Sequence, residues 1–214
     1  MTTISAWSTC EREWKNADHL WDFTGVAGTG KKRWLPLNVD RIISIRCFIQ
    51  RLLERKSRNL DGFFLNQGQI CRELTSVDCD IAILEGVMGY YDGIAGISTR
   101  ASAFEVAKWT KTPAVLIVDG KGMSVSVTAL IQGFLTYQTD NQIEGVIFNR
   151  VSPMLYPRLR KMVEEQLGIQ VYGYVPELKG FKLESRHLGL KASGRDQRVE
   201  RPDASVGKTD GKDG

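Results

Sequence analysis

Acidic and glycine residues gather at residues 85–93, in the segment EGVMGYYDG, directly after an apolar run. The carboxylate of Glu85 is the hard oxygen ligand that Mg²⁺ prefers, bound directly or through water. Gly86 and Gly89 would let the backbone approach a phosphate group closely, and Asp92 adds a second acid. The alternative is a solvated glutamate in an ordinary turn. The glycine density and Asp92 favour the metal and phosphate interpretation.

Two later apolar runs also end in polar residues. Asp119 opens the segment DGKG, where it is either a metal ligand or the cap of the next helix, and the cap is favoured. Asn149 and Arg150 follow the next run; an amide donates and accepts at once, which suits a purine edge, but a structural asparagine in a loop is equally common. Ser98 and Thr99 precede a helix as natural caps, and a helix N-terminus also attracts anions.

These segments belong to a regular alternation of apolar runs and amphipathic stretches between residues 80 and 175. The runs are short, rich in β-branched residues and bounded by Gly, Pro, Asp or Asn, as in strands covered on both faces. They cover residues 81–84, 114–118, 145–148 and 171–175. Between them, apolar residues at helical spacing predict three helices, of which the first covers residues 100–109.

Strand–helix–strand units in this order predict an α/β fold, with right-handed crossovers and a parallel sheet that has helices on both faces. In an open parallel sheet, ligands bind beyond the carboxyl ends of the strands. The polar residues that follow the apolar runs are therefore the candidates for chemistry.

Composition excludes several classes of protein. The 214 residues suit one domain with extensions or at most two small ones, and a net charge of +4 is too small for a nucleic-acid footprint. No run approaches the length of a membrane span, and no basic leader precedes an apolar stretch. The four cysteines, Cys10, Cys47, Cys71 and Cys79, show no metal spacing. We expect a cytoplasmic protein with reduced thiols.

Residues 1–56 and 191–214 differ in character from the middle. The first region reads as irregular and holds four of the five tryptophans; the second contains no aromatic residue and should be disordered. Residues 25–32 fit GxxxxGK, but Lys32 stands in the place of Ser or Thr. No convincing strand precedes this match, and Pro36 disfavours a helix after it. His187 is more simply structural than catalytic.

Four motifs together resemble those of the cobyrinic acid a,c-diamide synthase family. They are SRNLD at 57–61, EGVMGYYDG at 85–93, NRV at 149–151 and RHLGL at 186–190, in the family's order and spacing. The resemblance covers residues 57–190, the central part of the synthetase domain. It implies a P-loop fold akin to dethiobiotin synthetase and MinD, with ATP and Mg²⁺ as cofactors. The related enzymes that amidate nickel-sirohydrochlorin share much of the pattern and stay open as the substrate alternative.

The resemblance also implies a reaction and a set of roles. The family phosphorylates two acetate carboxylates of a corrinoid, and ammonia released from glutamine by a separate C-terminal domain then displaces the phosphate. The roles implied are Glu85 for Mg²⁺; Gly86, Gly89, Asn149 and Arg150 for the nucleotide, with Asn149 reading adenine; and Tyr90, Asp92, Ser98 and Thr99 on the substrate side. The partners implied are a tetrapyrrole substrate and a glutaminase domain, with no nucleic acid and no membrane. A homodimer is left open.

The chain departs from the family's pattern at both ends. The family begins with a strand and a GxGKT-type phosphate loop followed by GPDYIDP, and neither is readable here. The chain is also roughly half the family's length, and none of its cysteines replaces the glutaminase nucleophile. We therefore expect a fold incomplete at the N-terminus and a chain that is inactive alone. A short MinD/ParA-like ATPase that uses residues 25–31, and a non-catalytic binding module, are the alternatives.

A frameshift explains these departures. With free codon choice, residues 39–49 shifted by one base can encode GPDYIDPMFH, and residues 13–17 in the other frame can encode SGKT. We expect resequencing of the gene, translated in all three frames, to yield a phosphate loop, GPDYIDP and a downstream glutaminase domain. If the other frames hold nothing of the kind, the frameshift hypothesis is wrong and residues 25–31 become the phosphate-site candidate.

Overall fold

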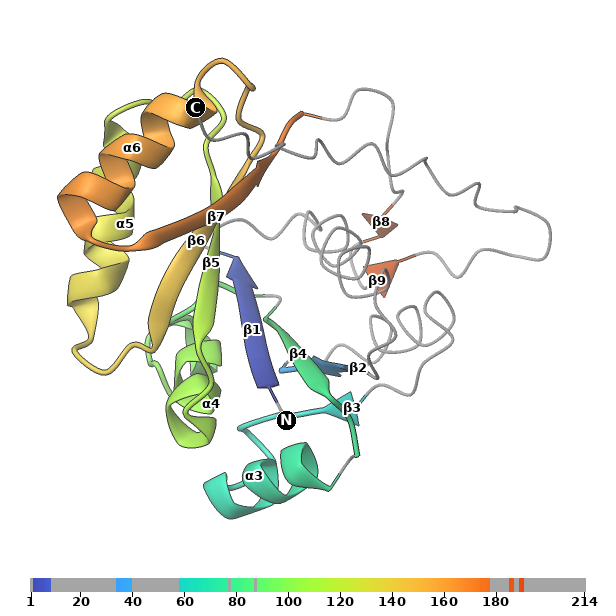
Figure 1. Cartoon of the computed structure of the whole chain (residues 1–214). Helices are drawn as coiled ribbons and strands as arrows, with labels where there is room; N and C mark the ends of the chain where they lie inside the picture. Colours follow the sequence, from blue (N-terminus) through green and yellow to red (C-terminus); the bar gives the residue numbers. More distant parts are fainter. Residues whose placement is uncertain are drawn as a thin grey trace.

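The computed structural model describes residues 2–8, 34–39, 58–76, 78–86, 88–177, 185–186 and 189–190. Its centre is a seven-stranded parallel sheet with strand order β3-β2-β4-β1-β5-β6-β7 (Figure 1). The strands are β1 (Thr2–Ser8), β2 (Trp34–Asn38), β3 (Arg58–Asn59), β4 (Ile81–Gly86), β5 (Ala114–Asp119), β6 (Ile143–Asn149) and β7 (Gln170–Val175). A separate antiparallel pair consists of β8 (Ser185–Arg186) and β9 (Gly189–Leu190).

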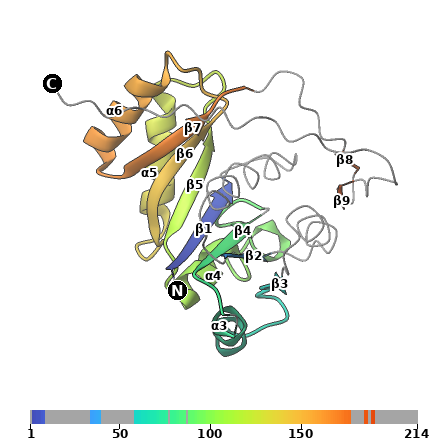
Figure 2. The ribbon, with the colours of Figure 1, turned by 45° about the vertical axis from the view of Figure 1, so that its right-hand side comes forward.

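Four α-helices connect the described strands, together with a short 3₁₀ helix at Ile94–Gly96. They are α3 (Gln67–Thr75), α4 (Ala103–Thr110), α5 (Ser126–Tyr137) and α6 (Tyr156–Leu167). Neighbouring helices pack in pairs, α3 with α4 and α5 with α6, and the second pair lies along the β5–β7 half of the sheet (Figure 1 and Figure 2). Within the described residues, no helix combines the length and the apolar character needed to cross a membrane.

All four of these helices cover the same face of the sheet. The connections β3-α3-β4, β4-α4-β5, β5-α5-β6 and β6-α6-β7 all advance in one direction across the strand order, and right-handed crossovers then share a face. The core agrees, because Leu84, Leu116 and Phe148 from the strands join Ile131 and Val163 from the helices in one buried cluster. Side chains that alternate with these strand residues face the other way.

The predicted parallel sheet with helices is confirmed, and all four apolar runs are strands within one or two residues of their expected bounds. The apolar residues of the three expected helices face the core, as shown by Phe104, Val127, Ile131, Leu159 and Val163. The helix α3 was not anticipated. Its start carries the signal Asn66-x-x-Gln69, a capping box in which each side chain bonds the other residue's backbone N–H.

The N-terminal region differs from its sequence expectation. Two strands lie within residues 1–56, and β1 occupies the centre of the sheet between β4 and β5, so the expected loss of the first strand is corrected. The β-branched residues of TTISAWS favour a strand. Several other expectations fall outside the described residues: the GxxxxGK match at 25–32, His187, Cys10, Cys47 and the tail at 191–214.

Gly93 closes the loop between β4 and α4 by a very close backbone approach. The Ile94 N–H donates to the Arg100 carbonyl at 3.0 Å. A Cβ at residue 93 would lie 2.1 Å from the Arg100 carbonyl oxygen and 2.5 Å from that of Ser98. Only glycine fits, because both neighbours are backbone atoms that cannot rotate away.

We therefore expect Gly93→Ala to lower the free energy of unfolding by about 1–3 kcal/mol, as overpacking does. Gly133→Ala is the matched control: it lies inside α5 with open space around it and should stabilise by about 0.5–1 kcal/mol. Urea unfolding of the full chain measures both. Equal midpoints for Gly93→Ala and the unmodified chain would contradict this account of the loop.

Candidate functional site

Three of the candidate polar residues lie at the carboxyl ends of the strands β4, β5 and β6. β5 and β6 are neighbours in the sheet, and β1 lies between β4 and β5. Glu85 is the penultimate residue of β4, Asp119 the last of β5 and Asn149 the last of β6. Each alternates with a core residue (Leu84, Val118 or Phe148), so all three are turned to the face opposite the helices. Glu85 is 6% exposed and Asn149 is 7% exposed.

The strand register separates these residues into two ends of one long edge. Asp119 is paired directly with Asn149. Glu85 is paired with Ala6 of β1, and Ala6 with Val115, which precedes Asp119 by four residues. Glu85 is therefore displaced from the level of Asp119 by about 13 Å toward the amino ends of the strands. It also lies three strand spacings away from β6. The resulting distance between the Cα atoms of Glu85 and Asn149 is about 20 Å.

At the β5–β6 end, Arg150 is held by Asp119. The Nε of Arg150 donates to Asp119 Oδ1 at 2.8 Å, and Nη2 binds the other carboxylate oxygen. The Lys121 N–H also donates to Asp119 Oδ1, at 3.2 Å. This pair fixes the loop beside Asn149, whose carbonyl accepts the Gly120 N–H at 2.8 Å.

The expectation that Asp119 caps the next helix is wrong. Helix α5 begins only at Ser126, and the residue before it, Val125, supplies no side-chain cap. The carboxylate of Asp119 instead serves the turn at Lys121 and the guanidinium of Arg150. A bidentate partner that follows the neighbouring strand β6 cannot be recognised from the sequence around Asp119.

At the β4 end, the glycine-rich segment folds back over itself. The Asp92 N–H donates to the Gly89 carbonyl at 2.9 Å. A Cβ on Gly89 would lie 2.4 Å from Asp92 Oδ2, so this carboxylate lies directly over Gly89. Gly86, the last residue of β4, is buried, whereas Asp92 is exposed. The segment thus presents one buried and one exposed carboxylate, at Glu85 and Asp92.

Tyr90, expected on the substrate side, has its side chain in the core. It is fully buried, and its hydroxyl donates to the carbonyl of Asn141, just before β6 begins. That carbonyl lies at the opposite edge of the sheet from Asn149, which ends β6. Burial raises the pKa of Tyr90, with smaller contributions from Tyr91 and Asp140. The ring is edge-on to Phe104 and Tyr91, so this tyrosine anchors the loop.

Ser98 and Thr99 do not cap the following helix, contrary to expectation. Helix α4 begins at Ala103, and its cap is Ser102, whose Oγ accepts the Glu105 N–H at 3.3 Å. Ser98 instead accepts the Arg100 N–H at 3.1 Å, and the Thr99 carbonyl accepts the Ser102 hydroxyl at 2.6 Å. The pattern Ser102-x-x-Glu105 is the capping signal that could have identified this start.

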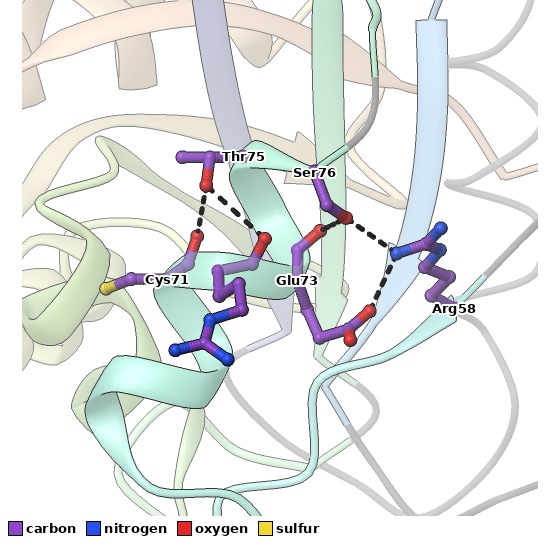
Figure 3. A network of polar contacts seen from close by, with 6 residues as sticks. Arg58, Cys71, Glu73, Thr75 and Ser76 are labelled. Atoms are coloured by element: carbon purple, nitrogen blue, oxygen red, sulfur yellow. Dashed lines mark hydrogen bonds and ion pairs between the residues drawn. The ribbon is translucent and has the colours of Figure 1, made fainter.

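One polar network ties β3 to α3 on the helix-covered face. Arg58 Nη1 donates to Glu73 Oε2 at 2.7 Å and to Ser76 Oγ at 2.8 Å (Figure 3). Ser76 in turn donates to the Glu73 carbonyl at 3.0 Å. The network holds the start of β3 against the end of α3, while β3 is paired with β2. Arg58 belongs to the motif SRNLD, but the spacing of that motif does not reveal these partners.

Glu85 is the residue of this edge that suits a divalent cation. In the described part of the chain, no three His, Cys, Asp or Glu side chains gather as a complete metal site. Mg²⁺ bound together with a nucleotide needs only one or two carboxylates, since phosphate oxygens and waters fill the remaining positions. A single buried carboxylate beside a glycine-rich turn fits that requirement.

Comparison with known proteins gives relatives for most of the chain. The profile of the family AAA_26, described as an AAA domain, matches residues 42–185. The chain is 39% identical over 171 residues to the cobyrinate a,c-diamide synthase of Caldanaerobacter subterraneus subsp. tengcongensis, an alignment that covers 78% of this chain and 38% of that protein. It is 40% identical over 144 residues to the enzyme of the same name from Streptococcus sanguinis, covering 65% and 32%. The aligned part spans about a third of the length of these curated relatives.

Solved structures share the fold at low sequence identity. FtsY from Physcomitrella patens chloroplasts superposes with a TM-score of 0.58 at 13% identity, covering 79% of this chain and 57% of that one. A ParA family ATPase from Chlorobium tepidum gives 0.50 at 9% identity, covering 83% and 85%. These likenesses identify a P-loop NTPase fold and carry no further information on the ligand.

The position of Tyr90 leads to a prediction for stability. Tyr90→Phe removes the hydrogen bond to Asn141 and should lower the free energy of unfolding by about 1 kcal/mol. Because the folded state raises the pKa of Tyr90, its stabilising effect is complete below about pH 10 and is lost at higher pH. The variant should therefore lose less stability than the unmodified chain above that pH.

Urea unfolding between pH 7 and pH 11 checks this, with the exposed Tyr137→Phe as the matched control. A substrate-contacting role for Tyr90 predicts the opposite pattern, in which stability is unchanged and ligand binding is lost.

Proposed function

The chain belongs to the AAA_26 family of AAA domains, and from this membership we propose that it is the central part of the ATP-using synthetase domain of a cobyrinate a,c-diamide synthase. The observation that carries the proposal is the place of the motif EGVMGYYDG. Its glutamate is buried at the carboxyl end of β4, beside β1, where an open parallel sheet binds its ligand.

The proposed reaction converts the a and c acetate side chains of cobyrinate to amides. A carboxylate oxygen attacks the γ-phosphorus of ATP, and ADP leaves as the acyl phosphate forms. The nitrogen of ammonia then attacks the acyl carbon, the carbon–oxygen bond to phosphate breaks, and the amide forms with loss of a proton. Ammonia derives from glutamine through a glutaminase domain. Positioning and charge stabilisation supply most of the catalysis in such phosphoryl transfers.

The residues take the following roles in this proposal. Glu85 would hold Mg²⁺, which when bound neutralises charge on the phosphates, and Gly86 would let the backbone approach them. Gly89 instead leaves room for the Asp92 carboxylate, which lies directly over it. Asn149 binds the adenine edge, and Arg150, paired with Asp119, holds the loop beside it. In the loop between β4 and α4, the exposed side chains of Asp92 and Ser98 and the partly buried Thr99 serve the substrate. Tyr90 supports the loop from the core, since its hydroxyl is engaged by Asn141.

Rival functions differ in what they require. A nickel-sirohydrochlorin diamide synthase uses the same carboxylate chemistry on another tetrapyrrole. A short MinD/ParA-like ATPase would need residues 25–32 as a phosphate loop, yet the described element that follows them directly is the strand β2, where a helix is required. A non-catalytic module would keep the sheet and bind no nucleotide.

The unaided chain should not complete the reaction. In this fold a phosphate loop follows β1, but the sequence from Thr9 to Thr24 contains no glycine. Without a glycine-rich cradle the phosphates lose their main source of positioning. We therefore propose weak nucleotide binding, and no amide product from cobyrinate, Mg-ATP and ammonium salt.

Calorimetric titration of the full chain tests the proposal. We expect cobyrinic acid to bind, and we expect Glu85→Gln to weaken the Mg²⁺-dependent part of ATP binding about tenfold. Glu144→Gln, at an exposed site near the start of β6, is the matched control and should change neither affinity.

The same titrations separate the rivals. Tighter binding of nickel-sirohydrochlorin would transfer the assignment to that substrate. Binding of ATP without either tetrapyrrole would favour the short ATPase, and a stable chain that binds none of the three would be a non-catalytic module.

A further inference from the structure

The short strand β3 places Asn59 in the same row of the sheet as Glu85. Asn38 of β2 is paired with Asn59 on one side and with Glu85 on the other. Two strand spacings separate Asn59 from Glu85, so their Cα atoms lie about 10 Å apart at the same level along the strands.

Asn59 and Glu85 are also turned to the same face. The side chain of Arg58 reaches Glu73 of α3 and Ser76, the residue that ends this helix, on the face that the helices cover (Figure 3). Successive residues of a strand point to opposite faces, so Asn59 faces away from α3. Glu85 faces away from the helices for the same reason, because Leu84 belongs to the helix-covered core.

The carboxamide of Asn59 has an unused acceptor. Its Oδ1 is buried and accepts no hydrogen bond from any residue that the structure describes. Buried polar atoms without a partner are few in native proteins, and each one calls for an explanation. Folding alone does not account for this one, because a leucine of similar volume would fill the position without an unsatisfied oxygen.

The order of the strands places Asn59 on one side of Glu85 and Asn149 on the other. In the proposed site a nucleotide has its phosphates at Glu85 and its base at Asn149. The nucleotide then occupies the β6 side of Glu85, so the γ-phosphoryl group is open to attack from the β3 side. The attacking and leaving oxygens of a phosphoryl transfer lie roughly in line. The phosphoryl acceptor therefore enters on the side where Asn59 lies.

We propose that Asn59 binds the peripheral acetate group of the tetrapyrrole that is phosphorylated and then amidated. The unpaired Oδ1 can accept an N–H of the amide that the reaction forms, and Nδ2 of the same carboxamide can donate to the carboxylate from which that amide forms. This inference rests on the proposed function, since it names the acceptor side of the same site.

The test compares Asn59→Leu with the unmodified full chain, using cobyrinic acid as the probe and the visible absorbance of the corrin ring as the readout. We expect the affinity for cobyrinic acid to fall at least about tenfold, with Mg²⁺-dependent ATP binding unchanged. The urea midpoint should stay the same or rise, because the variant removes a polar atom that has no partner.

Asn66→Ala is the matched control from the same part of the chain. The Asn66 side chain accepts the Gln69 N–H at 3.0 Å and caps α3, so this variant should lower the urea midpoint and leave cobyrinate binding unchanged. A structural role for Asn59 would make Asn59→Leu behave in the same way, which would overturn the inference.

The failure of the inference and that of the proposed function have different signatures. If the unmodified chain binds cobyrinic acid and Asn59→Leu binds it equally well, only the role of Asn59 is wrong. If the unmodified chain binds neither cobyrinic acid nor nickel-sirohydrochlorin, the proposed function fails and the inference fails with it. If the unmodified chain binds only nickel-sirohydrochlorin and Asn59→Leu loses that binding, the role of Asn59 is supported with that substrate.

Discussion

Strand β4 is paired on both sides, with β2 and with β1, and this pairing determines where the chemistry of the molecule can lie. A slip of one residue along either neighbour would turn Glu85 into the helix-covered core and Leu84 to the opposite face. The sheet therefore holds a carboxylate, 6% exposed, at one level of its carboxyl edge. A charge buried to that degree is costly unless it is paired or binds a cation. The proposed positions of the nucleotide and of the tetrapyrrole both depend on this fixed position of Glu85.

The rest of the edge follows from strand order. Asp119 and Asn149 are the last residues of two strands that are paired with each other. Arg150 forms a bidentate ion pair with Asp119. This end is separated from Glu85 by β1, so the site is elongated, with a polar group at each end. The loop after β4 is tied down elsewhere, by the hydroxyl of Tyr90 at Asn141 and by the close approach at Gly93. The loop can therefore present Asp92 to solvent while its base stays rigid.

The sequence predicted those parts of the molecule that depend on local pattern. The runs that became β4 to β7 are apolar on both faces, so their identity as strands did not depend on tertiary detail. β1 was missed because TTISAWS has no continuous apolar run, and its central place is set by pairing with β4 and β5.

The side-chain directions could not be predicted in the same way. Tyr90 and Asp119 each have a partner distant in sequence, Asn141 and Arg150, which no spacing around them reveals. Asn59 was quoted only as part of a motif, because its significance depends on its row in the sheet and on the face it shares with Glu85.

Hydrogen–deuterium exchange of the full chain, with and without cobyrinic acid, tests most directly whether this carboxyl edge is the tetrapyrrole site. The account predicts slower exchange in peptides that cover residues 58–61 and 85–93, and unchanged exchange in α6, which packs against α5 and β7. Protection confined to α6 would contradict it.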